Sequence, residues 1–318
     1  MKRRKFLKLA SSGLFVPMIS RGIDLPFFAP PPASGAAVDP VASNWAGRVV
    51  TNGGTAPTGT VIGAVSQLVT DLKAASLWTQ KFIFVDGVVP GPTVGVNPPA
   101  ASCIAPITPI LVGPASDPLL NSAGVNVSTL WPTSGATEIS LTGVKNNIFD
   151  VGCTAAALWA SATDIGLLFY ASDASYNSGD AAFGADDYNN TKRFRCRLNS
   201  GANSTLDCGG NDLSVNLQQA GGLYSFNRFA TNSLQVHFAS SGVAATTMIN
   251  NTTNDTNDPR ASAFNFWIMG EDNPAGGCCV FRNNCSFVAA TKALTLSEFG
   301  TAFTAIQAFR TTLGGGTI

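Results

Sequence analysis

The chain has 318 residues, of which 45% are hydrophobic and only 12% are charged, and its formal net charge at pH 7 is zero. This length and apolar content are enough for one large or two small domains with a buried core. A protein that binds nucleic acid needs a basic face to neutralise phosphates, so this charge balance argues against a nucleic-acid partner.

The first residues have the pattern of an export leader. A basic segment, residues 2–8, precedes a weakly apolar run, residues 9–19, and Arg21 follows it. Low hydrophobicity and a trailing basic residue are typical of twin-arginine leaders. We interpret residues 1–38 as such a leader with a Pro/Ala-rich linker, and a basic arm that binds a partner is the alternative. A leader places the protein in the periplasm, at the cell surface or outside the cell.

No stretch of the sequence reaches the roughly 20 continuous apolar residues that a transmembrane helix needs. We therefore predict no transmembrane span.

Residues 39–99 are predicted to form a helical preface. Ser43 or Asn44 is suited to cap a short helix that runs to Val50. A second helix is expected after Pro57, because apolar residues recur there at helical spacing. These residues are Val61, Val65, Leu68, Val69 and Leu72. The Phe- and Val-rich run at 81–89 predicts a strand.

Residues 100–295 contain short strand-like segments separated by clusters of Gly, Asn, Asp and Ser. This pattern is typical of an all-β, two-sheet antiparallel sandwich. Residues 165–170 and 265–270 are nearly all apolar, so we expect them to be central strands. The strand candidates are residues 138–141, 147–151, 164–170, 193–198, 213–217, 222–227, 234–239, 264–269 and 286–290.

The C-terminal segment, residues 296–318, predicts a helix that packs on the sandwich. Apolar residues recur in it at steps of three and four, and Gly314 to Gly316 end it. The recurring residues are Phe299, Phe303, Ile306 and Phe309.

The order of several short motifs resembles a family. The motifs are WAGRVVTNGG (45–54), LWTQK (77–81), ITPILVG (107–113), KNNIFDVG (145–152), FNFWIMG (264–270) and LSEF with IQAFRTTLG (296–314). In this order they are similar to uncharacterised bacterial and phage-associated proteins with a concanavalin A-like or laminin G-like jelly roll. The resemblance implies a jelly-roll sandwich over roughly residues 41–316, and it supplies no catalytic residues.

Seven cysteines suit an oxidising compartment. Cys196 and Cys208 flank a turn-rich segment and are the first candidates for a disulfide. Other candidates are a bridge from Cys279, or its neighbour Cys278, to Cys285, and a bridge from Cys103 to Cys153. The odd count leaves one thiol unpaired, and buried free thiols are the alternative. With one histidine and no C-x-x-C, a zinc site is not expected.

One polar loop has the oxygen-rich composition of a calcium site. Calcium takes six to eight oxygen ligands, and carboxylates and an amide cluster in this part of the chain. The candidate ligands are Asp173, Asn177, Asp180, Asp186 and Asp187. A solvated turn is the alternative, and residues 250–258 form a second polar loop with a weaker claim.

The usual constellations for catalysis are missing from the sequence. A glycosidase needs two carboxylates that face one groove, yet Glu138, Glu271 and Glu298 are scattered. A Ser-His-Asp triad would have to use His237, which we interpret as a surface residue of a strand. No G-x-S-x-G or phosphate-binding loop is present. We therefore do not expect an enzyme.

Sugar binding uses exposed aromatic faces beside polar side chains. Tyr176, Tyr188 and Tyr224 lie in or near polar loops and are the candidate ligand-binding residues. We hypothesise a non-enzymatic, exported protein that binds a glycan or a cell-surface protein. The alternative is a structural subunit of a phage-like particle or surface assembly, with self-association and a place in a virion.

Overall fold

The computed structural model describes most of the predicted sandwich and its helices. The described residues are 37–51, 56–86, 119–121, 133–135, 138–140, 148–171, 180–186, 192–198, 204–208, 213–215, 221–253, 255–268 and 285–313. Residues 1–36 of the predicted leader and linker lie outside them.

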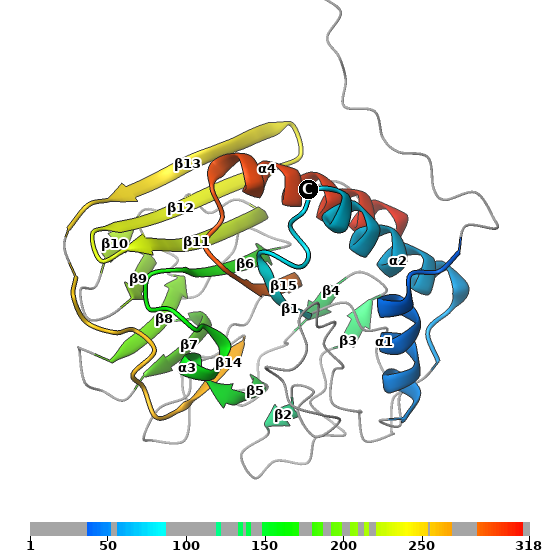
Figure 1. The fold of residues 1–318 in the computed structure, drawn as a ribbon, viewed down its shortest axis with the longest axis horizontal. Coiled ribbons are helices and arrows are strands. Elements are labelled where there is room, and N and C mark those ends of the chain that lie inside the picture. The colour runs from blue at the N-terminus through cyan, green and yellow to red at the C-terminus, as the bar shows by residue number, and fades with distance from the viewer. Residues whose placement is uncertain are drawn as a thin grey trace, which may run out of the picture. The chain divides into compact units, whose positions relative to one another are not determined.

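Two antiparallel sheets make up most of the fold (Figure 1). Sheet A has the order β13-β12-β11-β6-β15-β4-β3, with β1 also paired to β15, and sheet B has the order β10-β9-β8-β7-β14-β5-β2. The strands are β1 (Phe82–Asp86), β2 (Leu119–Asn121), β3 (Thr133–Gly135), β4 (Glu138–Ser140), β5 (Ile148–Thr154), β6 (Ile165–Ala171), β7 (Asp180–Asp186), β8 (Arg193–Leu198), β9 (Ser204–Cys208), β10 (Leu213–Val215), β11 (Gly222–Ala230), β12 (Ser233–Ser240), β13 (Val243–Asn251), β14 (Asn265–Ile268) and β15 (Cys285–Thr291). The predicted antiparallel β-sandwich is therefore confirmed at this level.

The two predicted central strands are confirmed. Strand β6 lies between β11 and β15, and all seven of its residues are buried. Strand β14 lies between β7 and β5 in the other sheet. Continuous apolar runs suit these places because both faces of such a strand are covered.

Aromatic side chains fill the space between the sheets. Phe183, Phe194 and Phe266 of sheet B lie within 6 Å of one another by ring centroids, and Phe226 of sheet A contacts Phe183 at 5.3 Å. Trp159, which follows α3 (Ala155–Leu158), meets two of these rings edge-on. Large aromatic rings bury much apolar area, so this cluster holds the sheets together.

Helices cover the other face of sheet A. Helix α1 (Pro40–Thr51), α2 (Gly59–Ala74) and α4 (Leu296–Thr312) share one buried apolar cluster with that face. From the sheet, Leu168 and Tyr170 of β6 take part, and from α4, Phe299 and Ile306 do. Figure 1 shows α2 and α4 side by side above the sheet. The predicted C-terminal helix is thus present and packs on the sandwich.

The start of α1 differs from the prediction. We expected Ser43 or Asn44 as its cap, but the helix begins at Pro40. The Asp39 carboxylate accepts a hydrogen bond from the Val41 N–H at 2.9 Å, and proline is favoured in the first helical position because it needs no donor. The second helix begins after Thr58, which caps it through the Val61 N–H.

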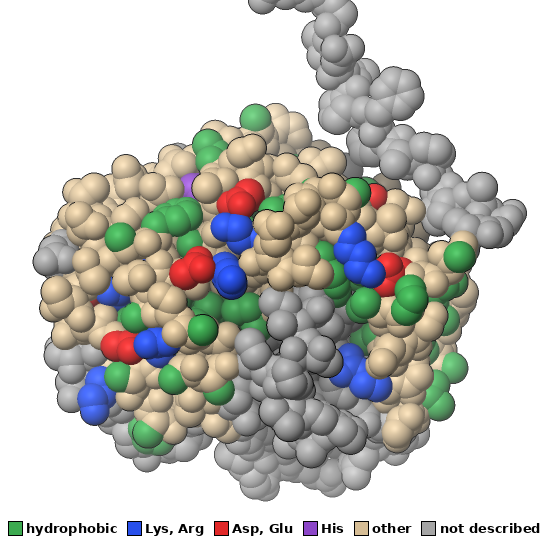
Figure 2. Space-filling view, in the orientation of Figure 1, with side chains coloured by type: hydrophobic (Ala, Val, Ile, Leu, Met, Phe, Trp, Pro, Cys, Tyr) green, Lys and Arg blue, Asp and Glu red, His purple; other side chains and the backbone are tan. Residues whose placement is uncertain are grey.

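Charges on the described surface are sparse and mixed. In the face drawn in Figure 2, basic and acidic side chains lie next to each other rather than in a patch of one sign. Lys73 forms an ion pair with Asp39, Lys81 with Glu298 and Arg260 with Asp258. Of the helices in the described part of the chain, none is long and apolar enough to cross a membrane.

Candidate functional site

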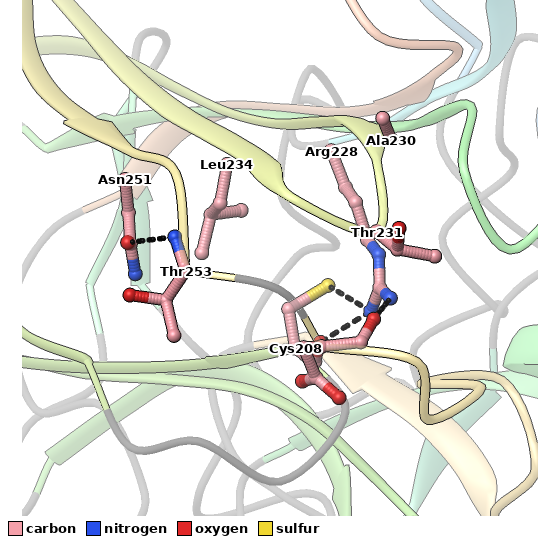
Figure 3. A pocket seen from close by; sticks show the side chains of 8 residues that line it. Cys208, Arg228, Ala230, Thr231, Leu234, Asn251 and Thr253 are labelled. Atoms are coloured by element: carbon pink, nitrogen blue, oxygen red, sulfur yellow. Dashed lines mark hydrogen bonds between the residues drawn. The ribbon is translucent and has the colours of Figure 1, made fainter.

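A hollow open to solvent lies at the end of the sandwich where β9 of sheet B approaches the β11–β12 hairpin of sheet A (Figure 3). The hollow is shallow: it has a cavity volume of about 20 Å³, and about 310 Å³ of empty space when open solvent is counted. The lining residues come from the ends of β9, β11 and β13, from the β11–β12 turn, from β12, and from the segment after β13. They are Cys208, Arg228, Ala230, Thr231, Leu234, Asn251, Thr253 and Asp255.

The buried guanidinium of Arg228 organises this end of the sandwich. Its side chain is 3% exposed, and it donates to three backbone carbonyls. Nη1 donates to the Cys208 carbonyl, and Nη2 donates to those of Asp255 at 2.6 Å and Asn257 at 3.1 Å. A buried charge is costly unless hydrogen bonds replace its hydration. Arg228 therefore ties both sheets to the segment that follows β13.

Short polar turns fix the segment after β13. The side-chain Oδ1 of Asn251 accepts from the Thr253 N–H at 2.8 Å, and the side-chain Oδ1 of Asp255 accepts from the Asn257 N–H at 2.9 Å. The Asp255 N–H donates to the Thr231 carbonyl at 2.7 Å and closes the segment onto the β11–β12 turn. Asn and Asp favour such turns because their side chains bond the backbone two residues ahead. The polar groups around the hollow are consequently held in place.

The next turn carries an ion pair. Arg260 donates to both carboxylate oxygens of Asp258, at 2.9 and 2.8 Å, and to the Trp159 carbonyl. This hydrogen bonding, mainly from Arg260, lowers the pKa of Asp258, and the charge of Arg228 adds to the effect. Asp258 therefore stays ionised and holds the turn.

The lining of the hollow suits a neutral, hydroxyl-bearing ligand. Leu234 forms an apolar floor between the Asn251–Thr253 pair and the Arg228–Cys208 pair (Figure 3). Thr231 and Thr253 are exposed, so their hydroxyls can donate or accept. Among the described lining residues, Asp255 carries the one carboxylate.

The tyrosine prediction is wrong for Tyr224. Its side chain is 1% exposed, and its ring packs 4.8 Å from Phe238 and 6.4 Å from Phe226. Tyr224 belongs to β11, where residues of both faces are buried, so it cannot stack on a ligand. Tyr176 and Tyr188 lie outside the described residues, and their roles stay predictions.

The five predicted calcium ligands do not form one site. Asp180 and Asp186 begin and end β7, a seven-residue strand, and such a strand separates its ends by about 20 Å. Calcium–oxygen distances are about 2.3–2.6 Å, so these two residues cannot share an ion. Asp173, Asn177 and Asp187 lie outside the described residues. Within the described ranges, no group of three metal-ligating side chains is found.

The predicted Cys196–Cys208 bridge is also wrong. Both residues are buried thiols in the structure. They lie on neighbouring strands, but Cys196 pairs with Leu206 and Cys208 pairs with Phe194. The two cysteines are therefore offset along the ladder rather than opposite each other. Of the other candidates, Cys103 and Cys279 lie outside the described residues. The structure describes only the backbone of Cys153 and Cys285.

His237 is buried, contrary to the surface position that we expected. Its side chain is 0% exposed, and its ring lies 5.7 Å from that of Phe299. Nε2 lies 3.1 Å from the Leu294 carbonyl oxygen and Nδ1 lies 3.0 Å from the Thr247 hydroxyl. The sequence places His237 on the face of β12 opposite to Val236 and Phe238, and we expected that face to be exposed to solvent. Helix α4 covers it, so His237 is buried.

The residues of the hollow were largely missed by sequence reasoning. The composition of the polar loop at 250–258 predicts only a weak calcium site. Its spacing of Asn251, Asp255 and Asp258, each followed two residues later by a bonded N–H, is a readable signal for successive turns. The approach of Cys208 and Arg228 to this loop depends on the pairing of strands and has no local signal.

Comparison with known proteins gives distant structural likenesses. No protein-family model matches the chain, and no curated protein matches it. A CBM40 of a Ruminococcus gnavus IT-sialidase is similar with 8% identity and a TM-score of 0.38, over 54% of this chain and 96% of that one. Domain 4 of AbnA, a GH43 extracellular arabinanase from Geobacillus stearothermophilus in complex with arabinotriose, has 13% identity and a TM-score of 0.33, over 54% and 82%. A Trypanosoma rangeli sialidase in complex with sialic acid has 12% identity and a TM-score of 0.37, over 77% and 39%.

Proposed function

We propose that this protein is a non-enzymatic glycan-binding protein that works outside the cytoplasm, and that the hollow beside Arg228 is its binding site. In this proposal the sandwich is a jelly roll of the concanavalin A-like and laminin G-like kind. The observation that carries the proposal is the lining of the hollow, where an amide and two hydroxyls surround an apolar floor. Sugars present hydroxyl groups around a less polar ring, so they match such a lining.

The contacts around the hollow support binding without rearrangement. The side-chain oxygen of Asn251 is occupied by the Thr253 N–H, which leaves the amide N–H groups with no partner among the described residues. Arg228 and Asp255 hold the rest of the rim through backbone contacts. Groups fixed before binding lose little conformational freedom when a ligand arrives.

A glycan-binding site needs no catalytic carboxyl groups, whereas a site for glycoside hydrolysis does. Glycosidases of the common kinds use two carboxyl groups about 5–9.5 Å apart, and the described lining holds only Asp255. The proposal therefore assigns no catalytic residue. Export rests on the basic and weakly apolar pattern of residues 2–21.

A glycan array with purified protein, read with and without calcium, tests the proposal. We expect binding to a defined group of glycans, and we expect Asn251→Ala or Thr253→Val to weaken it about tenfold, the effect of losing about 1.4 kcal/mol. Thr252→Val is the matched control, because Thr252 is exposed and adjacent but does not line the hollow. Glycan affinity that is unchanged in both Asn251→Ala and Thr253→Val would refute this site. No binding across the array, with a regular oligomer in solution, would favour the structural-subunit alternative.

A further inference from the structure

The edge strand β13 carries a row of exposed side chains that continues from the hollow. Asn251 pairs with Leu234 of β12, Ile249 pairs with Val236, and Thr246 pairs with Phe238. Leu234, Val236 and Phe238 alternate along β12 and point to one face. Directly paired residues of neighbouring strands share a face, so Asn251, Ile249 and Thr246 do as well.

A register shift in β13 creates this row. The ladder between β12 and β13 is irregular between Val236 and His237, where β13 contributes the extra residue Met248. In a regular strand, Thr246 and Asn251 would point to opposite faces because they are an odd number of residues apart. A bulge re-aims the side chains beyond it. Here it brings Thr246 to the side of the hollow.

The row is accessible along its length. Thr246 is exposed, and Ile249 and Asn251 are partly exposed, although the paired Val236 and Phe238 of β12 are buried. Strand β13 is the outermost strand of sheet A (Figure 1). No residue of β13 is charged. The row thus offers a hydroxyl, a branched apolar group and an amide to a neutral partner.

We infer that the binding site is an extended strip of surface side chains that begins at the hollow and continues along β13. It takes a neutral oligosaccharide chain rather than a single terminal sugar. This inference rests on the proposed glycan-binding function. The partners of Asn251 and Thr246, Leu234 and Phe238, are four residues apart along β12, which at about 3.3 Å per residue is about 13 Å and longer than one sugar unit. The hollow holds one end of the chain, and Ile249 and Thr246 contact the units beyond it.

A length series tests the strip. Isothermal titration with neutral cello-, xylo- and chito-oligosaccharides of one to six units measures affinity against chain length. We expect at least one series in which affinity rises by about tenfold or more between the shortest and the longest chain. Thr246→Val is expected to lower affinity for the long chains by about fivefold, the loss of one hydrogen bond, and to leave the shortest chain unaffected. Asn251→Ala is expected to weaken all lengths.

Two further variants distinguish a specific effect on the strip from a general effect on the protein. Thr246→Lys fills the strip with a charged side chain, and it is expected to remove the length dependence. Thr79→Val is the control, because Thr79 is exposed in the turn after α2. Far-ultraviolet circular dichroism and the melting temperature confirm that each variant is folded. Binding that is independent of length, or length dependence that survives Thr246→Lys, overturns the strip but not the hollow. If no oligosaccharide series binds and no glycan on the array binds either, both the strip and the proposed glycan-binding function are overturned.

Discussion

His237 on β12 and Thr247 on β13 are hydrogen-bonded across the strand pair, with the imidazole Nδ1 3.0 Å from the threonine hydroxyl. The other ring nitrogen, Nε2, donates to the Leu294 carbonyl, because a carbonyl can only accept. The neutral ring then accepts from Thr247 at Nδ1. The single histidine thus joins two strands to the segment that leads into α4.

This arrangement predicts an acid-sensitive stability. Burial lowers the pKa of His237 below its ordinary value of 6.5, although the bond to Leu294 opposes the shift. Because the folded state binds the proton less well than the unfolded state, stability is complete above pH 6.5 and falls as the pH drops below it. One proton contributes at most about 1.4 kcal/mol per pH unit. Urea unfolding at several pH values between 7.5 and 5, compared with His237→Gln, measures the difference. An equal slope in both proteins would contradict it.

Removing the guanidinium of Arg228 is expected to destabilise the fold strongly. Arg228→Met leaves the carbonyls of Cys208, Asp255 and Asn257 without their donor. An unsatisfied buried polar group costs about 1–3 kcal/mol, so we expect a loss of about 3 kcal/mol or more in urea unfolding. Arg228→Lys retains a donor and should lose less. Equal stability of Arg228→Met and the wild type would show that water replaces these bonds.

The capping box of α4 is expected to contribute about 1 kcal/mol. The Thr295 hydroxyl accepts from the Glu298 N–H, and the Glu298 carboxylate accepts from the Thr295 N–H. Thr295→Ala removes the cap, and such changes cost about 0.5–2 kcal/mol. Thr304→Ala in the same helix is the control, because Thr304 is exposed and its hydroxyl bonds only the Gly300 carbonyl. Thermal unfolding that ranks the two variants equally would argue against the cap.

The Glu298 carboxylate gives the same region a second pH dependence. Burial raises its pKa, but hydrogen bonds from Thr295 and Lys81 outweigh this and lower it below the ordinary 4.5. Its contribution is therefore present at neutral pH and is lost as the pH falls below 4.5 toward the folded-state pKa. Glu298→Gln is expected to flatten the stability profile in that range, measured by thermal unfolding between pH 5 and 3. An unchanged profile would contradict the assignment.

Trp159 is expected to stabilise the fold through a hydrogen bond as well as through apolar packing. Its Nε1–H donates to the Thr291 carbonyl at 2.7 Å, which joins the interior of the sandwich to β15. Trp159→Phe keeps an aromatic ring but leaves that carbonyl unsatisfied, so we expect a loss of about 2 kcal/mol. Chemical denaturation measures this loss. A change below about 0.5 kcal/mol would mean that the hydrogen bond makes no net contribution.

Cys196 is expected to be chemically inert in the folded protein. Burial raises the pKa of its thiol far above the usual range, and the thiolate is the reactive form. A thiol reagent added to native protein should leave Cys196 unmodified, and modification should appear once the chain is unfolded in urea. Peptide mass spectrometry under non-reducing conditions reads both results. A peptide pair linked through Cys196 and Cys208 would reinstate the disulfide.

Much of the fold can be predicted from the sequence, because local patterns of apolar residues determine many of its helices and strands. The apolar runs in β6 and β14 and the helical spacing in α4 identify these elements directly. Strand β7 was missed because its sequence, DAAFGAD, is rich in Ala, Gly and Asp, which are depleted in strands. It is a strand because β8 and β14 pair with both of its edges.

The site is less predictable because it is assembled from distant segments. Cys208 and Arg228 meet only once β9 and β11 are placed in their two sheets, and Tyr224 is covered only by that packing. Loop polarity indicated where ligands bind in general, but it did not distinguish an exposed tyrosine from one inside the sandwich.

The pairing of β1 with β15 has a consequence for the order of folding. The Lys81 ammonium donates to the Ala293 carbonyl, 212 residues further along the chain, and β1 has its described strand partner only in β15. During synthesis, α1, α2 and β1 emerge long before the segment they dock on. Strands β6, β11 and β12 supply part of the sheet face that they cover, but the apolar cluster is complete only when β15 and α4, within residues 285–312, have been made. Contacts of such long range form slowly, so the helical layer closes as a late event, and a chain truncated before α4 is expected to expose that apolar cluster and aggregate.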